Sequence, residues 1–182
     1  LRLGMLFHDI GKPQTMTVDE EGITHNKKHP AVGAEMTKKI LRRLKFDNDT
    51  TEKVVKLVLY HDQDIGATQA GVRRAMNRIG EDIFPMLFAV HRADISAQSD
   101  YMREEKLRKF SYIEELYDTV RSQGDAVSLK DLAITGRDLI AQGMKPGREI
   151  GAVLQSLLEQ VLEDPSLNTP EQLLEISKKI VT

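Results

Sequence analysis

Helical patterns of apolar residues follow one another along almost the whole chain, and this constrains the fold more than any other feature. No segment shows a convincing strand alternation, and only residues 14–28, with TMTV and GITH around Gly22, are compatible with a short hairpin. Helices are expected over residues 1–11, 29–46, 49–62, 68–79 and 100–122, and from about 81 into the nineties. Two or three more are expected after Gly124. The sequence therefore predicts an all-α fold.

The composition is that of a folded protein without thiol chemistry. The 182 residues include 26 basic and 28 acidic side chains, and 40% are hydrophobic, which excludes a disordered or fibrous chain. There are no cysteines, so disulfide scaffolds, cysteine nucleophiles and thiolate zinc sites are excluded. No apolar run approaches the roughly 20 residues of a membrane span, so we expect a cytoplasmic protein without a membrane partner.

The polar break around Gly124 divides the chain. We expect a helical domain over residues 1–122 and a small C-terminal helical tail over residues 125–182. The opening residues, LRLGMLFHDI, have the character of the middle of a core helix, with no capping residue before Leu1. This predicts that the first domain is truncated at its N-terminus and that the chain is a fragment.

One carboxylate is predicted to lie on a core-facing helix surface. With a rotation of 100° per residue, Asp94 projects into the middle of a stripe formed by Ile83, Leu87, Val90 and Ala97. A buried carboxylate costs several kcal/mol unless a positive group meets it. Either an Arg or Lys side chain or a bound cation would satisfy it.

Histidines and a second aspartate occupy comparable positions. His61 shares a helix face with Val54, Leu57 and Val58, where it would be either a satisfied core residue or a ligand. The pair His8 and Asp9 offers one nitrogen and one oxygen, the mixture that borderline and hard divalent metals accept. One cation would account for both carboxylates, so we predict that His8, Asp9 and Asp94 converge on one point.

Four segments containing these residues resemble a known family. LFHDIGKP, KHPAVGAE, LVLYHD and HRADISAQ occur in the order found in the HD-domain superfamily of metal-dependent phosphohydrolases. The set is most similar to the HD region of bacterial tRNA nucleotidyltransferases, the CCA-adding and poly(A) polymerase family. The segment ITGRDLIAQGMKPGREIGAVLQSLLEQVLEDP also resembles the C-terminal region of that family.

The resemblance implies a fold, a cofactor and partners. The fold would be an HD-domain helical bundle followed by the tail, and the partners would be tRNA or another RNA and an upstream nucleotidyltransferase head of the same protein. The cofactor would be a divalent metal (Mg, Mn, Co or Ni). Its ligands would be His8, Asp9, His29, His61 and Asp94, among which Asp9, His29 and His61 would also take part in catalysis.

Two departures from the family pattern affect these expectations. The superfamily places its first metal-binding histidine upstream of the HD pair, but none of the seven residues before His8 is a histidine. We therefore expect weak metal binding and little phosphohydrolase activity from this chain. The Gly-Ser motif and paired aspartates of the polymerase head are also missing, and we interpret Asp62-Gln63-Asp64 as an unrelated segment because it lacks the Gly-Ser turn.

Two groups of basic residues are candidates for RNA contacts. Lys38, Lys39, Arg42 and Arg43 lie on the outer face of one predicted helix, and Lys145 and Arg148 flank a Pro-Gly turn in the tail. By themselves they are compatible with a solvated helix face and an ordinary connector, whereas beside an RNA they would contact phosphates without sequence specificity.

Three functional hypotheses remain open from the sequence. The first is the HD and RNA-binding region of a tRNA nucleotidyltransferase, which serves CCA addition or repair at the tRNA 3′ end. The second is a metal-dependent HD phosphohydrolase that acts on nucleotides or cyclic phosphodiesters. The third is a helical scaffold with a vestigial cluster of His and Asp residues.

Overall fold

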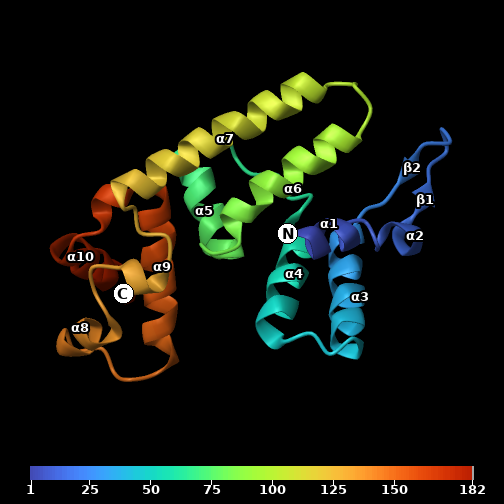
Figure 1. Cartoon of the computed structure of the whole chain (residues 1–182). Coiled ribbons are helices and arrows are strands. Elements are labelled where there is room, and N and C mark those ends of the chain that lie inside the picture. Colours follow the sequence, from blue (N-terminus) through green and yellow to red (C-terminus); the bar gives the residue numbers. More distant parts are fainter. Residues whose placement is uncertain (182) are drawn as a thin grey trace. The chain divides into compact units, whose positions relative to one another are not determined.

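The computed structural model describes residues 1–181 and confirms the all-α prediction (Figure 1). The two strands are short and pair antiparallel. No helix among the described residues is long and apolar enough to cross a membrane. The elements are α1 (Arg2–Phe7), α2 (Lys12–Thr15), β1 (Thr17–Val18), β2 (Thr24–His25), α3 (His29–Arg43), α4 (Asn48–Tyr60), α5 (Gln69–Ile79), α6 (Phe84–Ala97), α7 (Arg103–Gln123), η1 (Leu129–Asp131), α8 (Gly136–Ala141), α9 (Arg148–Glu163), η2 (Pro165–Leu167) and α10 (Pro170–Val181).

The described residues form two compact units, and the boundary differs from the expected division at residues 122–125. The first unit comprises residues 1–65 and 79–114, and the second comprises residues 66–78 and those from 115 onward. Most of α5 and the end of α7 therefore belong with the C-terminal helices. The amphipathic pattern of α5 identifies it as a helix but does not specify its packing partner.

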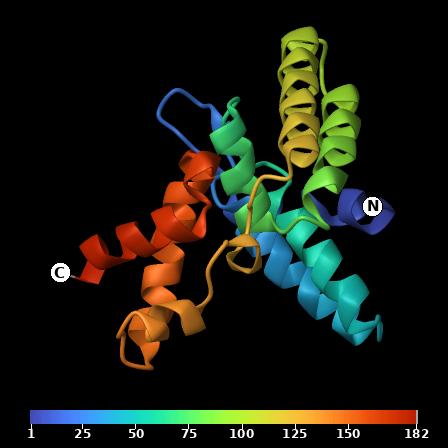
Figure 2. The same cartoon turned by 90° about the vertical axis from the view of Figure 1, so that its left-hand side faces the viewer.

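In the first unit, α3 and α4 lie side by side as an antiparallel pair (Figures 1 and 2). Their contact buries Ala34, Leu41, Val54 and Val58. The predicted helices over 29–46 and 49–62 are thus confirmed to within a few residues. This pair places the first residue of α3 and the residue after α4 at the same end of the unit.

The first helix ends at Phe7 rather than at Gly11, and a turn of four residues follows. This turn passes so close to the start of α3 that a Cβ atom on Gly11 would lie 2.2 Å from the carbonyl oxygen of His29. Only glycine permits this approach without moving the backbone. Gly11 therefore brings the residues of the turn next to His29.

The hairpin predicted within residues 14–28 is present, with Thr17 opposite His25 and Val18 opposite Thr24. Asp19 closes its loop, since Oδ1 accepts hydrogen bonds from the backbone N–H groups of Glu21 and Ile23.

Asp94 does not lie in the middle of a buried stripe, so this sequence prediction is wrong. Its side chain is 30% exposed, and Ala97 is exposed. In the last turn of α6 only Ile95 is buried, so ideal rotation around the helix overstates the burial of Asp94 and Ala97. The buried face of α6 consists of Phe84, Leu87, Phe88, Val90, His91 and Ile95.

Arg73 of α5 connects this helix to Asp125 and to the end of α9 in the second unit. Its side chain is buried and forms an ion pair with Asp125, with Nη1 and Oδ2 2.8 Å apart. Nε and Nη2 donate to the backbone oxygens of Leu162 and Glu163, at 2.7 and 3.0 Å. These carbonyl groups belong to the last turn of α9, where no N–H donors of the same helix are left to bind them. A positive charge is favourable at this end of a helix.

Candidate metal centre

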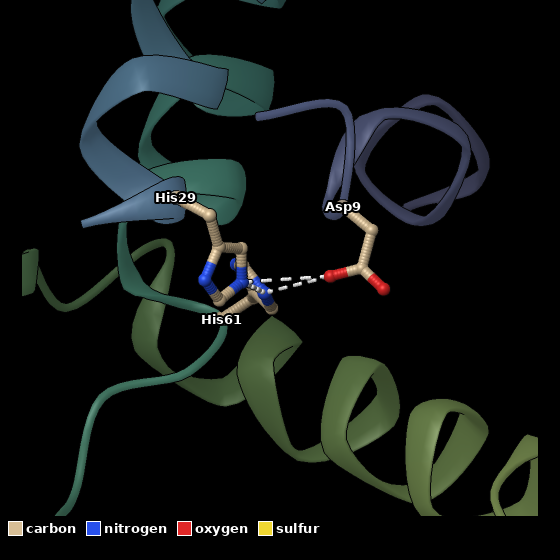
Figure 3. Close-up of side chains that lie close together, drawn as sticks. All are labelled: Asp9, His29 and His61. Atoms are coloured by element: carbon tan, nitrogen blue, oxygen red, sulfur yellow. Dashed lines mark hydrogen bonds and ion pairs between the residues drawn. The ribbon is translucent and has the colours of Figure 1, made fainter. Parts of the chain in front are cut away.

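The structure brings together all five residues predicted to bind a metal, and all of them belong to the first unit. His8 follows α1, Asp9 lies in the next turn, and His29 is the first residue of α3. His61 follows the last residue of α4, and Asp94 lies near the end of α6. Figure 3 shows the side chains of Asp9, His29 and His61 pointing toward one another.

Asp9 stands at the centre of the cluster and uses both carboxylate oxygens. Oδ1 lies 3.5 Å from Nε2 of His29 and 3.7 Å from Nε2 of His61. Oδ2 lies 3.4 Å from Nε2 of His8, which is also 3.4 Å from Oδ1 of Asp94. The expected convergence of His8, Asp9 and Asp94 is therefore present.

The three histidine rings are held in the same way. Nδ1 of each ring faces the backbone oxygen of the residue three positions earlier, at 2.7 Å for His8, 2.8 Å for His29 and 2.7 Å for His61. Because a carbonyl oxygen only accepts hydrogen bonds, each Nδ1 carries the hydrogen. In the neutral rings, Nε2 is then left with a lone pair that faces the cluster, which is the orientation of a metal-binding histidine.

Two features of this arrangement fit a bound cation. Nε2 of His8 is buried and has no hydrogen-bond partner among the described residues. Nε2 of His29 and Nε2 of His61 lie 3.1 Å apart, where two lone pairs repel each other unless a proton or a cation lies between them. Two nitrogens bound at about 2.1 Å and at right angles to one cation would be roughly 3.0 Å apart. The donors therefore fit a divalent metal.

The electrostatic environment favours the protonation states that bind metal. Burial raises the pKa of Asp9, but the hydrogen bond from Lys12 and the neighbouring His8 outweigh this and hold it below its ordinary value. Burial is also the main reason why the pKa of His61 is lowered, with a further contribution from the nearby His29. At neutral pH, Asp9 is thus an anion and His61 is uncharged.

Lys12 is a site residue that sequence reasoning missed. Its Nζ atom lies 2.5 Å from Oδ2 of Asp9. The available signal was its position three residues after Asp9 in HDIGK. Lys12 also lines a cavity of about 330 Å³ beside the cluster, together with Asp9, His25, Asn26, Lys27, His29, His61, Asp62, Asp94 and Gln98.

His91 is a second residue that the sequence analysis did not single out. It lies three residues before Asp94, is buried, and stacks on Phe110 with ring centroids 4.0 Å apart. Its Nε2 atom is buried without a hydrogen-bond partner among the described residues. Burial, followed by the nearby His61, lowers the pKa of His91 to about 4. The free energy of unfolding should therefore depend on pH through the protonation of His91.

We expect the free energy of unfolding to fall by about 2–3 kcal/mol from pH 7 to pH 4 on account of His91 alone. The unfolded residue takes up a proton near pH 6.5 and the folded residue only near pH 4, so the unfolded state binds more protons in this window. Urea titrations at several pH values measure the free energy of unfolding, and in His91→Phe its loss between pH 7 and pH 4 should be smaller by this amount. An identical loss in both proteins would show that His91 does not cause the pH dependence.

The basic residues predicted to contact RNA are solvent-accessible. On α3, Lys39, Arg42 and Arg43 are exposed and Lys38 is half-buried. None of these four forms an ion pair within residues 1–181. At 1.5 Å per residue they lie about 14 to 21 Å along the helix from His29. In the second unit, Lys145 and Arg148 are exposed at the turn that leads into α9.

Comparisons with known proteins add an independent line of evidence. Residues 31–177 match the family described as tRNA nucleotidyltransferase domain 2. The chain is 31% identical over 161 residues to the A-adding tRNA nucleotidyltransferase of Deinococcus radiodurans. It is 32% identical over 164 residues to the CC-adding tRNA nucleotidyltransferase of Thermus thermophilus.

The matches cover most of this chain but only part of each relative. They span 87% of the chain and 37% of the Deinococcus protein, and 89% of the chain and 36% of the Thermus protein. No solved structure gives a significant match. The chain thus corresponds to little more than a third of the length of the relatives it matches.

Proposed function

Since this chain belongs to the tRNA nucleotidyltransferase family, we propose that it is the RNA-holding region of an enzyme that adds nucleotides to the 3′ end of tRNA. The observation that carries this proposal is the match of residues 31–177 to a domain of that family. A nucleotidyltransferase head of the same protein would supply the polymerase chemistry. The names of both relatives refer to nucleotide addition, which favours this hypothesis over a free-standing HD phosphohydrolase.

We further propose that the cluster around Asp9 is a divalent metal centre of this region, in keeping with the resemblance to HD proteins. His29 and His61 would bind through Nε2, with Oδ1 of Asp9 completing this side. His8 and Asp94 would provide further ligand atoms next to Oδ2 of Asp9. A bound divalent metal polarises phosphoryl oxygens and lowers the pKa of bound water.

The protein's own residues prepare this centre. The carbonyl oxygens of Met5, Asn26 and Val58 fix the orientation of the three rings. Lys12 holds Asp9 ionised through their ion pair and lines the edge of the cavity. These contacts support a site that binds a phosphate group.

The exposed basic side chains of α3 would bind the RNA backbone. Their spacing from His29 along one rigid helix would let an RNA lie along α3 while one of its phosphates reaches the cluster. Lys145 and Arg148 would provide a second phosphate contact within the C-terminal unit. Such contacts set affinity and position and are independent of base sequence.

We expect the double variant Arg42→Ala/Arg43→Ala to bind tRNA about tenfold more weakly at physiological salt. Removing two phosphate contacts should also reduce the slope of log affinity against log salt by close to two. Fluorescence anisotropy with labelled tRNA at several salt concentrations measures both quantities.

The matched control is Lys53→Ala/Lys56→Ala, which removes the same charge from the neighbouring helix α4. These lysines are already paired with Asp49 and Glu52. Their loss should have little effect on tRNA binding. Equal losses in the two double variants would show that only net charge matters and would contradict a binding face on α3.

A further inference from the structure

A second cavity lies next to the metal centre, between the end of α6 and the first half of α7. Its volume is about 280 Å³, slightly below the roughly 300–1,000 Å³ of typical small-molecule pockets. It shares His61, Asp62, Asp94 and Gln98 with the cavity beside the cluster, so the two are adjacent. Its other lining residues are Gln63, Asp64, His91, Ile95, Lys106, Lys109 and Phe110.

Two lysines of α7 line this cavity, and their environments differ. Lys109 is neutralised, because its Nζ lies 2.7 Å from Oδ1 of Asp64. Lys106 instead donates to the neutral side-chain oxygen of Gln98 at 2.9 Å and forms no ion pair within residues 1–181. An ammonium group has three donors, so Lys106 keeps two for a ligand. Lys106 is thus a positive charge on the cavity wall without a direct carboxylate partner.

Gln98 connects this lysine to the metal centre. While its Oε1 accepts from Lys106, its Nε2 donates to Oδ2 of Asp94 at 2.7 Å. The other oxygen of Asp94 faces His8. A group bound by Lys106 therefore lies one side chain away from a proposed metal ligand.

The rest of the cavity suits a flat and mostly uncharged group. Ile95 and Phe110 provide apolar surface, and Gln63 provides a polar amide. The carboxylates of Asp62, Asp64 and Asp94 would repel a second phosphate inside the cavity. A ligand with one phosphate beside Lys106 and an uncharged ring system beyond it fits the apolar lining and avoids a second phosphate near the carboxylates.

We propose that Lys106 binds the phosphate of a nucleotide whose nucleoside part occupies the cavity between α6 and α7. This inference rests on the proposed metal centre, because a bound divalent cation offsets the charge of Asp94 and attracts the same phosphate. The nucleotide is either free or the end of an RNA chain. Nucleotide binding consequently depends on the metal.

The test is a calorimetric titration of the 182-residue chain, first with Mn²⁺ alone and then with inorganic phosphate, AMP and an RNA trinucleotide in the presence of Mn²⁺. We expect AMP to bind at least tenfold more tightly than phosphate. Lys106→Met should weaken both about tenfold, since a charge-assisted hydrogen bond is lost. Lys53→Met is the control: this lysine of α4 is paired with Asp49 and lies outside the cavity, so its loss should change either affinity less than twofold. Tighter binding of the trinucleotide than of AMP identifies an RNA end as the source.

The outcomes separate this inference from the function proposed above. If Mn²⁺ binds but phosphate binds wild type and Lys106→Met equally well, Lys106 is not a phosphate ligand and the inference fails alone. Equal affinities for AMP and phosphate would remove the nucleoside from the cavity. If the chain binds no Mn²⁺, both the proposed metal centre and the nucleotide site that rests on it are wrong.

Discussion

Replacing Arg73 with methionine is expected to lower the free energy of unfolding of the C-terminal unit by about 3–5 kcal/mol. The substitution leaves Asp125 buried without its partner, and it deprives the carbonyl oxygens of Leu162 and Glu163 of their donors. Loss of these contacts should expose the end of α9. Urea denaturation followed by circular dichroism measures the change.

The neighbouring Arg74 provides the control. It also pairs with an acidic side chain, that of Glu163, but both partners are mostly exposed. Exposed pairs contribute about 0–1 kcal/mol, so Arg74→Met should be nearly neutral. Adding Asp125→Leu to Arg73→Met should restore part of the stability, because no charge is then left buried. Similar effects of the two single arginine variants would show that burial of Arg73 is unimportant.

The fold was predictable where local patterning determines it. The helices at 29–43 and 48–60 and the hairpin around Gly22 follow from periodicity and turn residues, and the structure confirms them. The assignment of α5 to the C-terminal unit was not predictable. It depends on bonds from Arg73 to residues 52 and about 90 positions away, which leave no local pattern in the sequence.

The cluster was predictable for a different reason. Histidines and aspartates at helix ends or on apolar faces differ from their apolar surroundings, which singled out His8, Asp9, His61 and Asp94. The resemblance to the HD-domain superfamily added His29. Asp94 was selected on a faulty premise, because its side chain lines a cavity and is not part of the core.

Three residues next to the cluster, Lys12, Lys106 and His91, were harder to recognise from the sequence. Lys12 and Lys106 look like ordinary surface lysines, and only their neighbours Asp9 and Gln98 distinguish them. His91 was hidden because it lies on the buried face of an apolar helix, where the sequence gives no sign of its missing hydrogen-bond partner.

The largest effect on ligand binding is expected from Asp9→Asn, which should weaken Mn²⁺ binding by about 100-fold or more. The carboxylate contacts three of the imidazole nitrogens of the cluster and supplies the negative charge on both sides. An asparagine keeps the shape of the side chain but not this charge, and removal even of outer partners of metal ligands costs about 10–100-fold.

Asp19→Asn is the matched control for this change. Asp19 also faces an imidazole, with Oδ2 2.6 Å from Nε2 of His25 in the hairpin. No second histidine among the described residues pairs with it, so it lacks the convergent donors of the cluster. Its replacement should leave the affinity for Mn²⁺ within twofold of the wild-type value.

A Mn²⁺ titration of three proteins tests most directly whether the cluster around Asp9 holds a divalent cation. We predict saturable binding by the wild-type chain and by Asp19→Asn, and loss of that binding in Asp9→Asn while circular dichroism shows an intact helical fold. Equal Mn²⁺ affinities in wild type and Asp9→Asn would show that Asp9 does not bind the cation.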